Sequence, residues 1–295
     1  MIVKYVVGAK FKRAGTSLDE WRKLDEWIVK YQKTPPGTEI QPVEINALTA
    51  EWVRAATAQT DNAILYLHGG GFIIGSPATH RELAAQLSAV AKTQVLLLDY
   101  RLAPEHPFPA AMQDAISAYH WLVEQGYPAQ RIAVGGDSAG GGITLQALIA
   151  LRDAGIPLPA GAFFLSPVTD MVNFDGDSYS TRANTDPMFT TPEMSKFGTK
   201  QYVGNNDPAT PLLSPLKIDL SGLPPMCIHV GDQEVLLSDS VRLAERARAA
   251  GVEVELKIWP KLWHVFQTNA RHLPEAHQSL AEIGRFIQNS ALTEK

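Results

Sequence analysis

The order of hydrophobic and polar residues predicts alternating strands and helices along most of this chain. Runs such as Val95-Leu96-Leu97-Leu98 are apolar throughout, which is typical of strands buried on both faces of a sheet. Between the runs, apolar residues recur at the spacing of an amphipathic helix. This alternation predicts an α/β fold, a mostly parallel sheet with helices on both sides. Strands are predicted at Val43–Asn46, Trp52–Ala55, Ala63–Leu67, Gln94–Asp99, Arg131–Gly135, Gly161–Leu165, Met226–Gly231 and Val254–Trp259, and helices at Thr79–Ala91, Ala110–Gln125, Gly140–Asp153 and Asp239–Ala250.

Two segments interrupt this alternation. Near the N-terminus, Ser17–Lys33 opens with Ser17-x-x-Glu20, the spacing of a helix capping box, and its apolar residues recur at helical intervals. The prolines and the glycine of residues 34–37 end this helix. Further along, residues 169–213 are rich in Asp, Asn, Thr and Pro, with one predicted helix at Pro192–Tyr202. Such an insertion is usually either a functional lid or a disordered loop.

The composition is that of a globular protein with a large core. The 295 residues are enough for one large α/β domain or two small ones, and the 45% of hydrophobic residues is enough to bury a sizeable core. The net charge is −5 and the basic residues are scattered, so we interpret them as solvated helix faces and predict no nucleic-acid partner. No stretch approaches the roughly 18 apolar residues of a membrane-spanning helix, so no membrane span is predicted.

Cysteine usage bears on the compartment. Cys227 is the single cysteine of the chain, so no intrachain disulfide can form. This fits a reducing compartment, and we predict a cytoplasmic location. Cys227 lies in the apolar run Met226-Cys227-Ile228, and we interpret it as a core residue and not as a reactive thiol.

A serine flanked by glycines is the first candidate for chemistry. Gly136-Asp137-Ser138-Ala139-Gly140 follows the predicted strand Arg131–Gly135 directly and precedes a predicted helix. In this context G-x-S-x-G indicates a nucleophile elbow, a sharp turn that lifts the serine hydroxyl clear of the sheet. The glycines remove Cβ atoms that would collide where strand and helix close up. A phosphate-binding loop is the alternative, but no dinucleotide fingerprint or Walker lysine is present, which favours Ser138 as a nucleophile.

A glycine-rich loop follows an earlier strand. His68-Gly69-Gly70-Gly71-Phe72 comes directly after Ala63–Leu67, and its glycines let backbone N–H groups approach a bound carbonyl. Acyl transfer needs two or three such donors at the developing oxyanion, each worth about 3 kcal/mol. The H-G-G-G pattern after the third strand is the donor loop of lipases and esterases, with a flexible surface turn as the alternative. We interpret His68 as a residue that holds this loop and not as a proton carrier.

The general base is expected near the end of the chain. In α/β-hydrolases the triad runs in the order serine, acid, histidine. Of the eight histidines, His264 alone lies in the short segment directly after the last predicted strand, Val254–Trp259. His272 and His277 lie on or near the last helix and are interpreted as exposed. No two histidines have H-x-x-x-H spacing, so no metal ion is predicted.

Two acidic residues compete for the third place in the triad. Asp232 and Glu234 both follow the predicted strand Met226–Gly231, between the serine and the histidine. Either carboxylate could orient His264 and stabilise its imidazolium form. Asp232 abuts the strand end and could instead form a turn. These residues alone leave the choice open.

Together, these motifs resemble the hormone-sensitive-lipase family of esterases, the bacterial family IV carboxylesterases. The resemblance covers roughly Glu44 to Phe286. It rests on H-G-G-G-F at 68–72, Gly75-Ser76, Y-R-L-A-P-E-H-P-F-P at 100–109, G-D-S-A-G-G at 136–141 and H-V-F at 264–266. The family's usual acid motif, Asp-Pro-Leu, is replaced here by Glu234-Val235-Leu236, three residues after Gly231. Since some relatives look similar and carry glutamate as the acid, the resemblance favours Glu234 over Asp232.

The resemblance implies an α/β-hydrolase fold, with an eight-stranded, mostly parallel sheet flanked by helices and a helical cap. Residues 1–45 would form the N-terminal helical cap segment, residues 46–168 and 214–295 the core, and residues 169–213 an insertion that contributes to the cap. Oxyanion donors are implied at Gly70, Gly71 and Ala139. The residues predicted to bind substrate are Phe72, Asp137 and Phe189. Other candidates for the lining of the acyl pocket are Trp21, Trp27, Met188 and Phe197. For the apolar side chains of both sets, ordinary packing beneath a cap is the alternative.

The predicted function is that of a serine carboxylesterase that hydrolyses short- to medium-chain acyl esters through an acyl-enzyme intermediate, without a cofactor. A lactone hydrolase would use the same triad in a pocket of different shape, and a peptidase or amidase on this fold is a further alternative. A non-catalytic ligand receptor on the scaffold would lack the histidine, whereas His264 is present. The expected partner is a small-molecule ester, and the predicted edge strand Val254–Trp259 makes a homodimer plausible.

Overall fold

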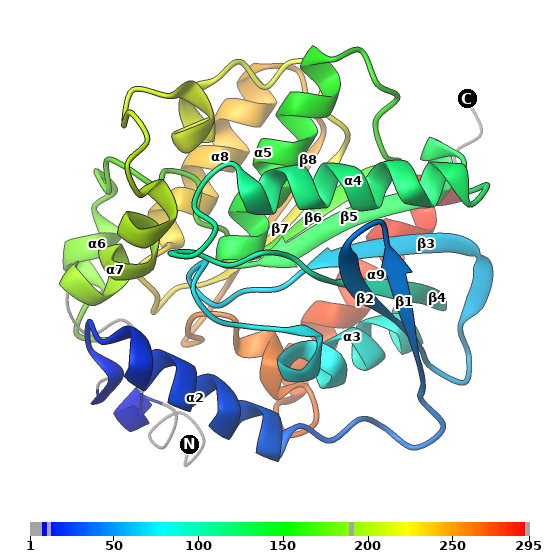
Figure 1. Cartoon of the computed structure of the whole chain (residues 1–295), viewed down its shortest axis with the longest axis horizontal. Coiled ribbons are helices and arrows are strands. Elements are labelled where there is room, and N and C mark those ends of the chain that lie inside the picture. The colour runs from blue at the N-terminus through cyan, green and yellow to red at the C-terminus, as the bar shows by residue number, and fades with distance from the viewer. Residues whose placement is uncertain (1–7, 11–12, 189–191, 293–295) are drawn as a thin grey trace.

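The computed structural model describes residues 8–10, 13–188 and 192–292, which form an α/β structure around an eight-stranded sheet (Figure 1). The strands are β1 (Glu39–Ile45), β2 (Leu48–Arg54), β3 (Gln59–Leu67), β4 (Thr93–Asp99), β5 (Ile132–Asp137), β6 (Gly161–Leu165), β7 (Met226–Gly231) and β8 (Val254–Trp259). The described helices are α2 (Leu18–Tyr31), α3 (Pro77–Ala91), α4 (Ala110–Glu124), α5 (Ala139–Asp153), α6 (Ser178–Thr181), α7 (Pro192–Val203), α8 (Leu237–Ala249) and α9 (Pro274–Leu292). These elements confirm the predicted alternation, with ends that differ from the predicted ones by a few residues.

The sheet has the strand order β1-β2-β4-β3-β5-β6-β7-β8. β2 runs antiparallel to both β1 and β4, and all other neighbouring strands are parallel. This confirms the predicted mostly parallel sheet of eight strands. In a parallel sheet the carboxyl ends of the strands meet at one edge, where ligands usually bind. The loops after β3, β5, β6, β7 and β8 therefore gather at the same edge.

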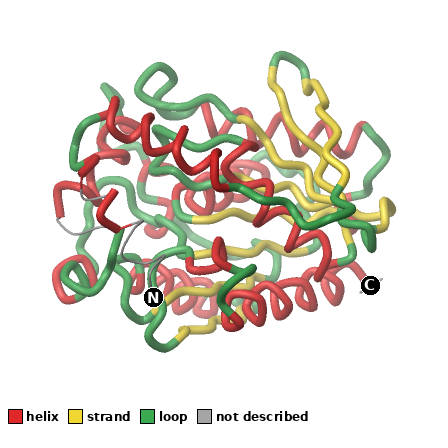
Figure 2. The backbone as a smooth tube through the Cα atoms, turned by 90° about the horizontal axis from the view of Figure 1, so that it is seen from below, coloured by secondary structure: helices red, strands yellow, loops and turns green. Residues whose placement is uncertain are grey.

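Helices cover both faces of the sheet, as the views of Figures 1 and 2 show. Leu65 and Leu67 of β3 pack into the cluster that includes α4 and α5, whereas Ile64 and Tyr66 pack with α3 and α9. This alternation is the period of two that a strand imposes on its side chains. α8 packs with α5 against β6 and β7. Because both faces are covered, the central strands are apolar throughout.

The N-terminal helix and the insertion are additions to the layers that flank the sheet, and Trp21, Leu24, Met194 and Tyr202 join them to the core. Ser17 is the N-cap of α2, and its hydroxyl accepts the N–H of Glu20 at 3.4 Å. The first turns of α2 lie on the same side of the molecule as α6 and α7 (Figure 1). Residues 39–45, which we assigned to the cap segment, instead form β1 and belong to the sheet, because they pair along their whole length with β2.

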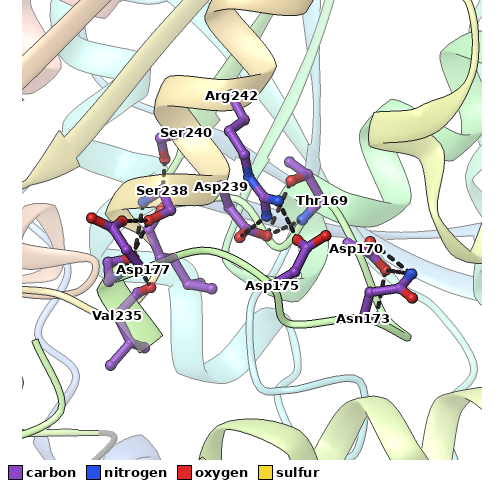
Figure 3. Close-up of polar contacts among 12 residues, drawn as sticks. Thr169, Asp170, Asn173, Asp175, Asp177, Val235, Ser238, Asp239, Ser240 and Arg242 are labelled. Atoms are coloured by element: carbon purple, nitrogen blue, oxygen red, sulfur yellow. Dashed lines mark hydrogen bonds and ion pairs between the residues drawn. The ribbon is translucent and has the colours of Figure 1, made fainter. Parts of the chain in front are cut away.

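Buried carboxylates tie the start of the insertion to α8 (Figure 3). The Asp239 carboxylate accepts hydrogen bonds from the N–H and the hydroxyl of Thr169, at 2.8 and 3.0 Å. Arg242 forms ion pairs with both Asp239 and Asp175. Asp170 accepts the hydroxyl of Ser214 at 2.8 Å, which joins the two ends of the insertion. The described part of residues 169–213 is therefore anchored to the helix that follows the predicted acid.

Candidate active site

Ser138 occupies a strained turn between β5 and α5. Its backbone has φ 52° and ψ −116°, a conformation that costs a non-glycine residue about 1–3 kcal/mol. Its N–H donates to Leu165 O at 2.8 Å. A Cβ on Gly136 would lie 2.1 Å from Leu67 O, and a Cβ on Gly140 would lie 1.9 Å from the same atom. The G-x-S-x-G spacing thus reflects the close approach of β3 to both sides of the elbow.

A hydrogen-bonded chain of three side chains begins at this serine. Ser138 Oγ lies 3.0 Å from His264 Nε2, and His264 Nδ1 lies 2.8 Å from Glu234 Oε2. All three residues are buried. They come from the loops that follow β5, β7 and β8, so the parallel sheet brings them together from positions far apart in the sequence. This is the geometry of a nucleophile, a base and an orienting acid.

Glu234, and not Asp232, faces the histidine. The second carboxylate oxygen of Glu234 accepts the Gly231 N–H at 2.6 Å and the Ser166 hydroxyl at 2.8 Å. Asp232 instead accepts the N–H of Lys261 at 2.7 Å. Its carboxylate therefore stabilises the turn after β8, which was one of the two roles open to it in the sequence.

The electrostatic environment of His264 favours a proton on the ring. Burial lowers the pKa of His264, but the hydrogen bond and the charge of Glu234, with a contribution from Asp186, outweigh burial and leave this pKa above the ordinary value of 6.5. An imidazolium formed when the serine loses its proton would be stabilised by the same contacts.

The glycine-rich loop lies beside the elbow. Gly70 and Gly71 have φ 124° and 61°, which glycine adopts without strain. Ala139 opens α5, where N–H groups have no partner within the helix. Among the described residues, none accepts a hydrogen bond from the N–H of Gly70, Gly71 or Ala139. These three donors are thus available for a ligand at the predicted oxyanion position.

A cavity of about 480 Å³ opens in front of Ser138. Its apolar wall is formed by side chains from α2, the insertion and the loop of the histidine, namely Trp21, Trp27, Ile28, Met188 and Trp263. Asp25 and His80 supply polar groups. In the described part of the chain, no three His, Cys, Asp or Glu side chains are arranged to hold a metal ion.

The residues predicted to bind substrate lie in different surroundings. Phe72 does not line the cavity: it is buried and stacks on Tyr202 of α7, with ring centroids 4.1 Å apart, so the structure corrects this prediction. Asp137 borders the cavity, but its carboxylate accepts hydrogen bonds from Tyr66 and Gly69 beneath the loop. Phe189 lies outside the described residues. Phe197 packs against the core and does not line the cavity either.

Three residues near the site are not predicted from the sequence. Ser166 donates to Glu234, and it could have been suspected because it directly follows an apolar strand run at the active edge of the sheet. Asp186 accepts the N–H groups of Met188 at 2.9 Å and Val235 at 3.1 Å, and burial raises its pKa to about 6. His80 pairs with Asp137. No local pattern singles out Asp186 or His80.

Comparisons with known proteins agree with this geometry. Residues 64–268 match a family described as having the alpha/beta hydrolase fold. The chain is 43% identical over 256 residues to an acetyl-hydrolase of Streptomyces hygroscopicus, covering 87% of this chain and 84% of that protein. A solved esterase of the bacterial hormone-sensitive lipase family superposes with a TM-score of 0.92 at 43% identity, covering 97% of each chain. EstE5, soaked with p-nitrophenyl butyrate, superposes with a TM-score of 0.88 at 43% identity, covering 93% of this chain and 91% of that one.

Proposed function

The chain belongs to the hormone-sensitive-lipase esterases of the alpha/beta-hydrolase-fold family, and we propose that it cleaves short- to medium-chain acyl esters through an acyl-enzyme on Ser138. The observation that carries the proposal is the chain of hydrogen bonds from Ser138 through His264 to Glu234. A serine hydroxyl is a weak nucleophile by itself and needs an adjacent base, which in turn needs a fixed orientation.

In the first half of the reaction, His264 Nε2 takes the proton of Ser138 as Oγ attacks the ester carbonyl carbon. The negative charge that develops on the carbonyl oxygen is bound by the N–H groups of Gly70, Gly71 and Ala139. The tetrahedral intermediate then breaks its bond to the alcohol oxygen, and His264 delivers the proton to that oxygen. The alcohol leaves, and the acyl group remains on Ser138.

In the second half, water replaces the alcohol. His264 accepts a proton from the water molecule as its oxygen attacks the acyl carbonyl, and the same three N–H groups bind the oxyanion again. Collapse of this intermediate breaks the bond to Ser138 Oγ, which regains its proton from His264. Glu234 stays ionised throughout and holds the imidazole in the tautomer that presents Nε2 to the serine.

The cavity supports a small hydrophobic acyl group. Its volume of about 480 Å³ and its aromatic wall from α2 favour an apolar chain over a charged one. A relative named as an acetyl-hydrolase and a relative soaked with p-nitrophenyl butyrate support the short end of this range.

We also propose a cytoplasmic location and a homodimer. The only cysteine of the chain, Cys227, is buried, which supports a protein that needs no oxidising compartment. No helix in the described ranges is both long and apolar enough to cross a membrane. β8 is an edge strand whose Ile258 is 44% exposed, so a second copy pairing along this strand would cover an apolar side chain.

Substitution of the nucleophile tests the proposed function. In Ser138→Ala, we expect the turnover of p-nitrophenyl butyrate to fall by roughly 10⁴- to 10⁶-fold, and labelling by a fluorophosphonate probe to disappear. Ser221→Ala, at an exposed serine remote from the cavity, is the matched control and should keep both. Unchanged turnover in Ser138→Ala would refute the proposal. A panel of p-nitrophenyl esters and γ-butyrolactone locates the acyl preference, and a higher kcat/KM for the lactone would favour a lactone hydrolase.

A further inference from the structure

His80 lies where the oxyanion loop, the nucleophile elbow and α2 meet. It belongs to the first turns of α3, borders the cavity, and its side chain is 11% exposed. Its Nε2 lies 3.4 Å from Asp137 Oδ1. No step of the proposed reaction uses this histidine, although it contacts the residue that directly precedes Ser138.

The hydrogen bonds around Thr79 place a proton on Nδ1 of His80. The Thr79 hydroxyl has one hydrogen, and this hydrogen goes to Ser76 O, which can only accept, at 2.8 Å. The hydroxyl oxygen therefore acts as an acceptor toward its other two neighbours, the Ser76 N–H at 3.0 Å and His80 Nδ1 at 2.8 Å. His80 must then donate from Nδ1.

The surroundings of Asp137 place a second proton on Nε2. Asp137 Oδ1 accepts the Tyr66 hydroxyl at 2.8 Å and the Gly69 N–H at 2.9 Å, so this oxygen carries no proton of its own. Burial raises the pKa of Asp137, but His80 and the Tyr66 hydrogen bond outweigh this and leave the pKa below its ordinary value. A nitrogen that faces such an oxygen is favourable only as a donor. With protons on both nitrogens, His80 is an imidazolium.

The other titratable groups around His80 agree with this charge. They are Asp137 at the end of β5, Tyr66 on β3, His68 in the oxyanion loop and Asp25 on α2. Burial lowers the pKa of His80, but the two carboxylates outweigh burial and leave this pKa above 6.5. Burial and the neighbouring His80 lower the pKa of His68 to about 3, so His68 is the neutral member of this pair.

We propose that His80 is a positioning residue of the esterase reaction: its imidazolium keeps the Asp137 carboxylate charged beneath Gly69, and so fixes the Gly70 and Gly71 N–H groups where the oxyanion forms. The loop and this carboxylate are in close contact, because a Cβ on Gly69 would lie 2.1 Å from Asp137 Oδ2. Since the Asp25 carboxylate accepts the Gly75 N–H at 3.1 Å, α2 holds the other end of the same loop. This inference rests on the proposed function.

Two variants separate the charge of His80 from its shape. His80→Gln retains a donor that can reach Asp137 but removes the charge, and His80→Leu removes both. For p-nitrophenyl butyrate we expect kcat to fall about 10-fold in His80→Gln and about 100-fold in His80→Leu, with KM within about 3-fold, because displaced donors affect the transition state more than the bound ester. Loss of the His80 proton should produce an alkaline decline in the wild-type kcat, and both variants should lack this decline.

His277→Gln is the matched control, because His277 is an exposed histidine of α9, and it should keep the wild-type kcat and pH profile. Histidine ¹⁵N NMR of the wild-type protein tests the charge without any substitution, and should find His80 doubly protonated at neutral pH. A neutral His80, or variants with the wild-type kcat and alkaline decline, would overturn the inference. These outcomes differ from failure of the proposed function, in which Ser138→Ala would keep its turnover.

Discussion

The two sides of the active site are held together in different ways. On the nucleophile side, backbone meets backbone: β3, the elbow and the oxyanion loop approach so closely that a Cβ on Gly136 or Gly140 would overlap Leu67 O. On the acid side, side chains bridge separate loops. Glu234 accepts hydrogen bonds from Ser166 and Gly231, and Asp186 of the insertion accepts the N–H of Val235.

This difference determines how much each side can vary. Where backbones are in contact, the site depends on the absence of side chains, and almost any substitution has to move the chain. Where side chains make the bonds, another carboxylate or another hydroxyl could serve if its oxygen reached the same place. The nucleophile side therefore accepts few residue types, whereas the acid side depends on a set of partners from distant elements.

Of the three tests that compare the two sides, substitution of the acid should have the largest effect. In Glu234→Gln, the amide cannot stabilise the imidazolium and can favour the wrong tautomer of His264, so kcat should fall by roughly 10³- to 10⁴-fold. Asp232→Asn is the matched control and should stay within about 3-fold, because Asp232 contacts the turn at Lys261. Steady-state kinetics with p-nitrophenyl butyrate measures both. Loss of activity in Asp232→Asn but not in Glu234→Gln would show that Asp232, and not Glu234, is the acid of the triad.

An intermediate effect is expected on the nucleophile side. In Gly140→Ala, the new Cβ would lie 1.9 Å from Leu67 O and 2.6 Å from His68 O. We expect this substitution to lower the free energy of unfolding by about 3 kcal/mol or more. In the control Gly155→Ala nothing lies within 4 Å, and its φ of +69° should cost only about 1–2 kcal/mol. Urea denaturation compares the two, and equal losses would refute the role of backbone contact at the elbow.

The smallest effect is expected in the pH dependence of kcat/KM, through which Glu234 on the acid side influences the base that activates Ser138. The protonated form of His264 cannot accept the serine proton, so kcat/KM should decline as the pH falls through the pKa of this histidine. Because Glu234 raises that pKa, the midpoint in the free enzyme should lie above 6.5. In Glu234→Gln, the residual activity should show this decline at a lower pH than in the wild-type enzyme. A wild-type midpoint below 6.5, or no shift in the variant, would contradict the electrostatic role of Glu234.

The sequence predicts the nucleophile side well because its determinants are local. Apolar runs locate β3 and β5, and the glycines beside Ser138 appear in the sequence because backbone clearance permits no other residue there. The order of serine, acid and histidine follows from the order of the parallel strands. The fold and the position of the serine are therefore encoded by short segments that can be interpreted separately.

The rest of the site depends on contacts between distant segments. Phe72 was predicted to bind substrate, but its ring packs on Tyr202, a residue 130 positions away in the insertion. The choice between Asp232 and Glu234 depends on which carboxylate the Ser166 hydroxyl and His264 reach. The periodicity of hydrophobic residues does not predict such contacts, because each contact joins loops that follow different strands.

A crystal structure of the enzyme after reaction with an alkyl phosphonate p-nitrophenyl ester tests the assembled site most directly. The phosphorus atom should be bonded to Ser138 Oγ, and the phosphoryl oxygen should lie within about 3 Å of the nitrogen atoms of Gly70, Gly71 and Ala139. His264 Nε2 should remain next to the serine oxygen. An adduct on another residue, or a phosphoryl oxygen turned away from these three nitrogens toward solvent, would contradict the proposed mechanism.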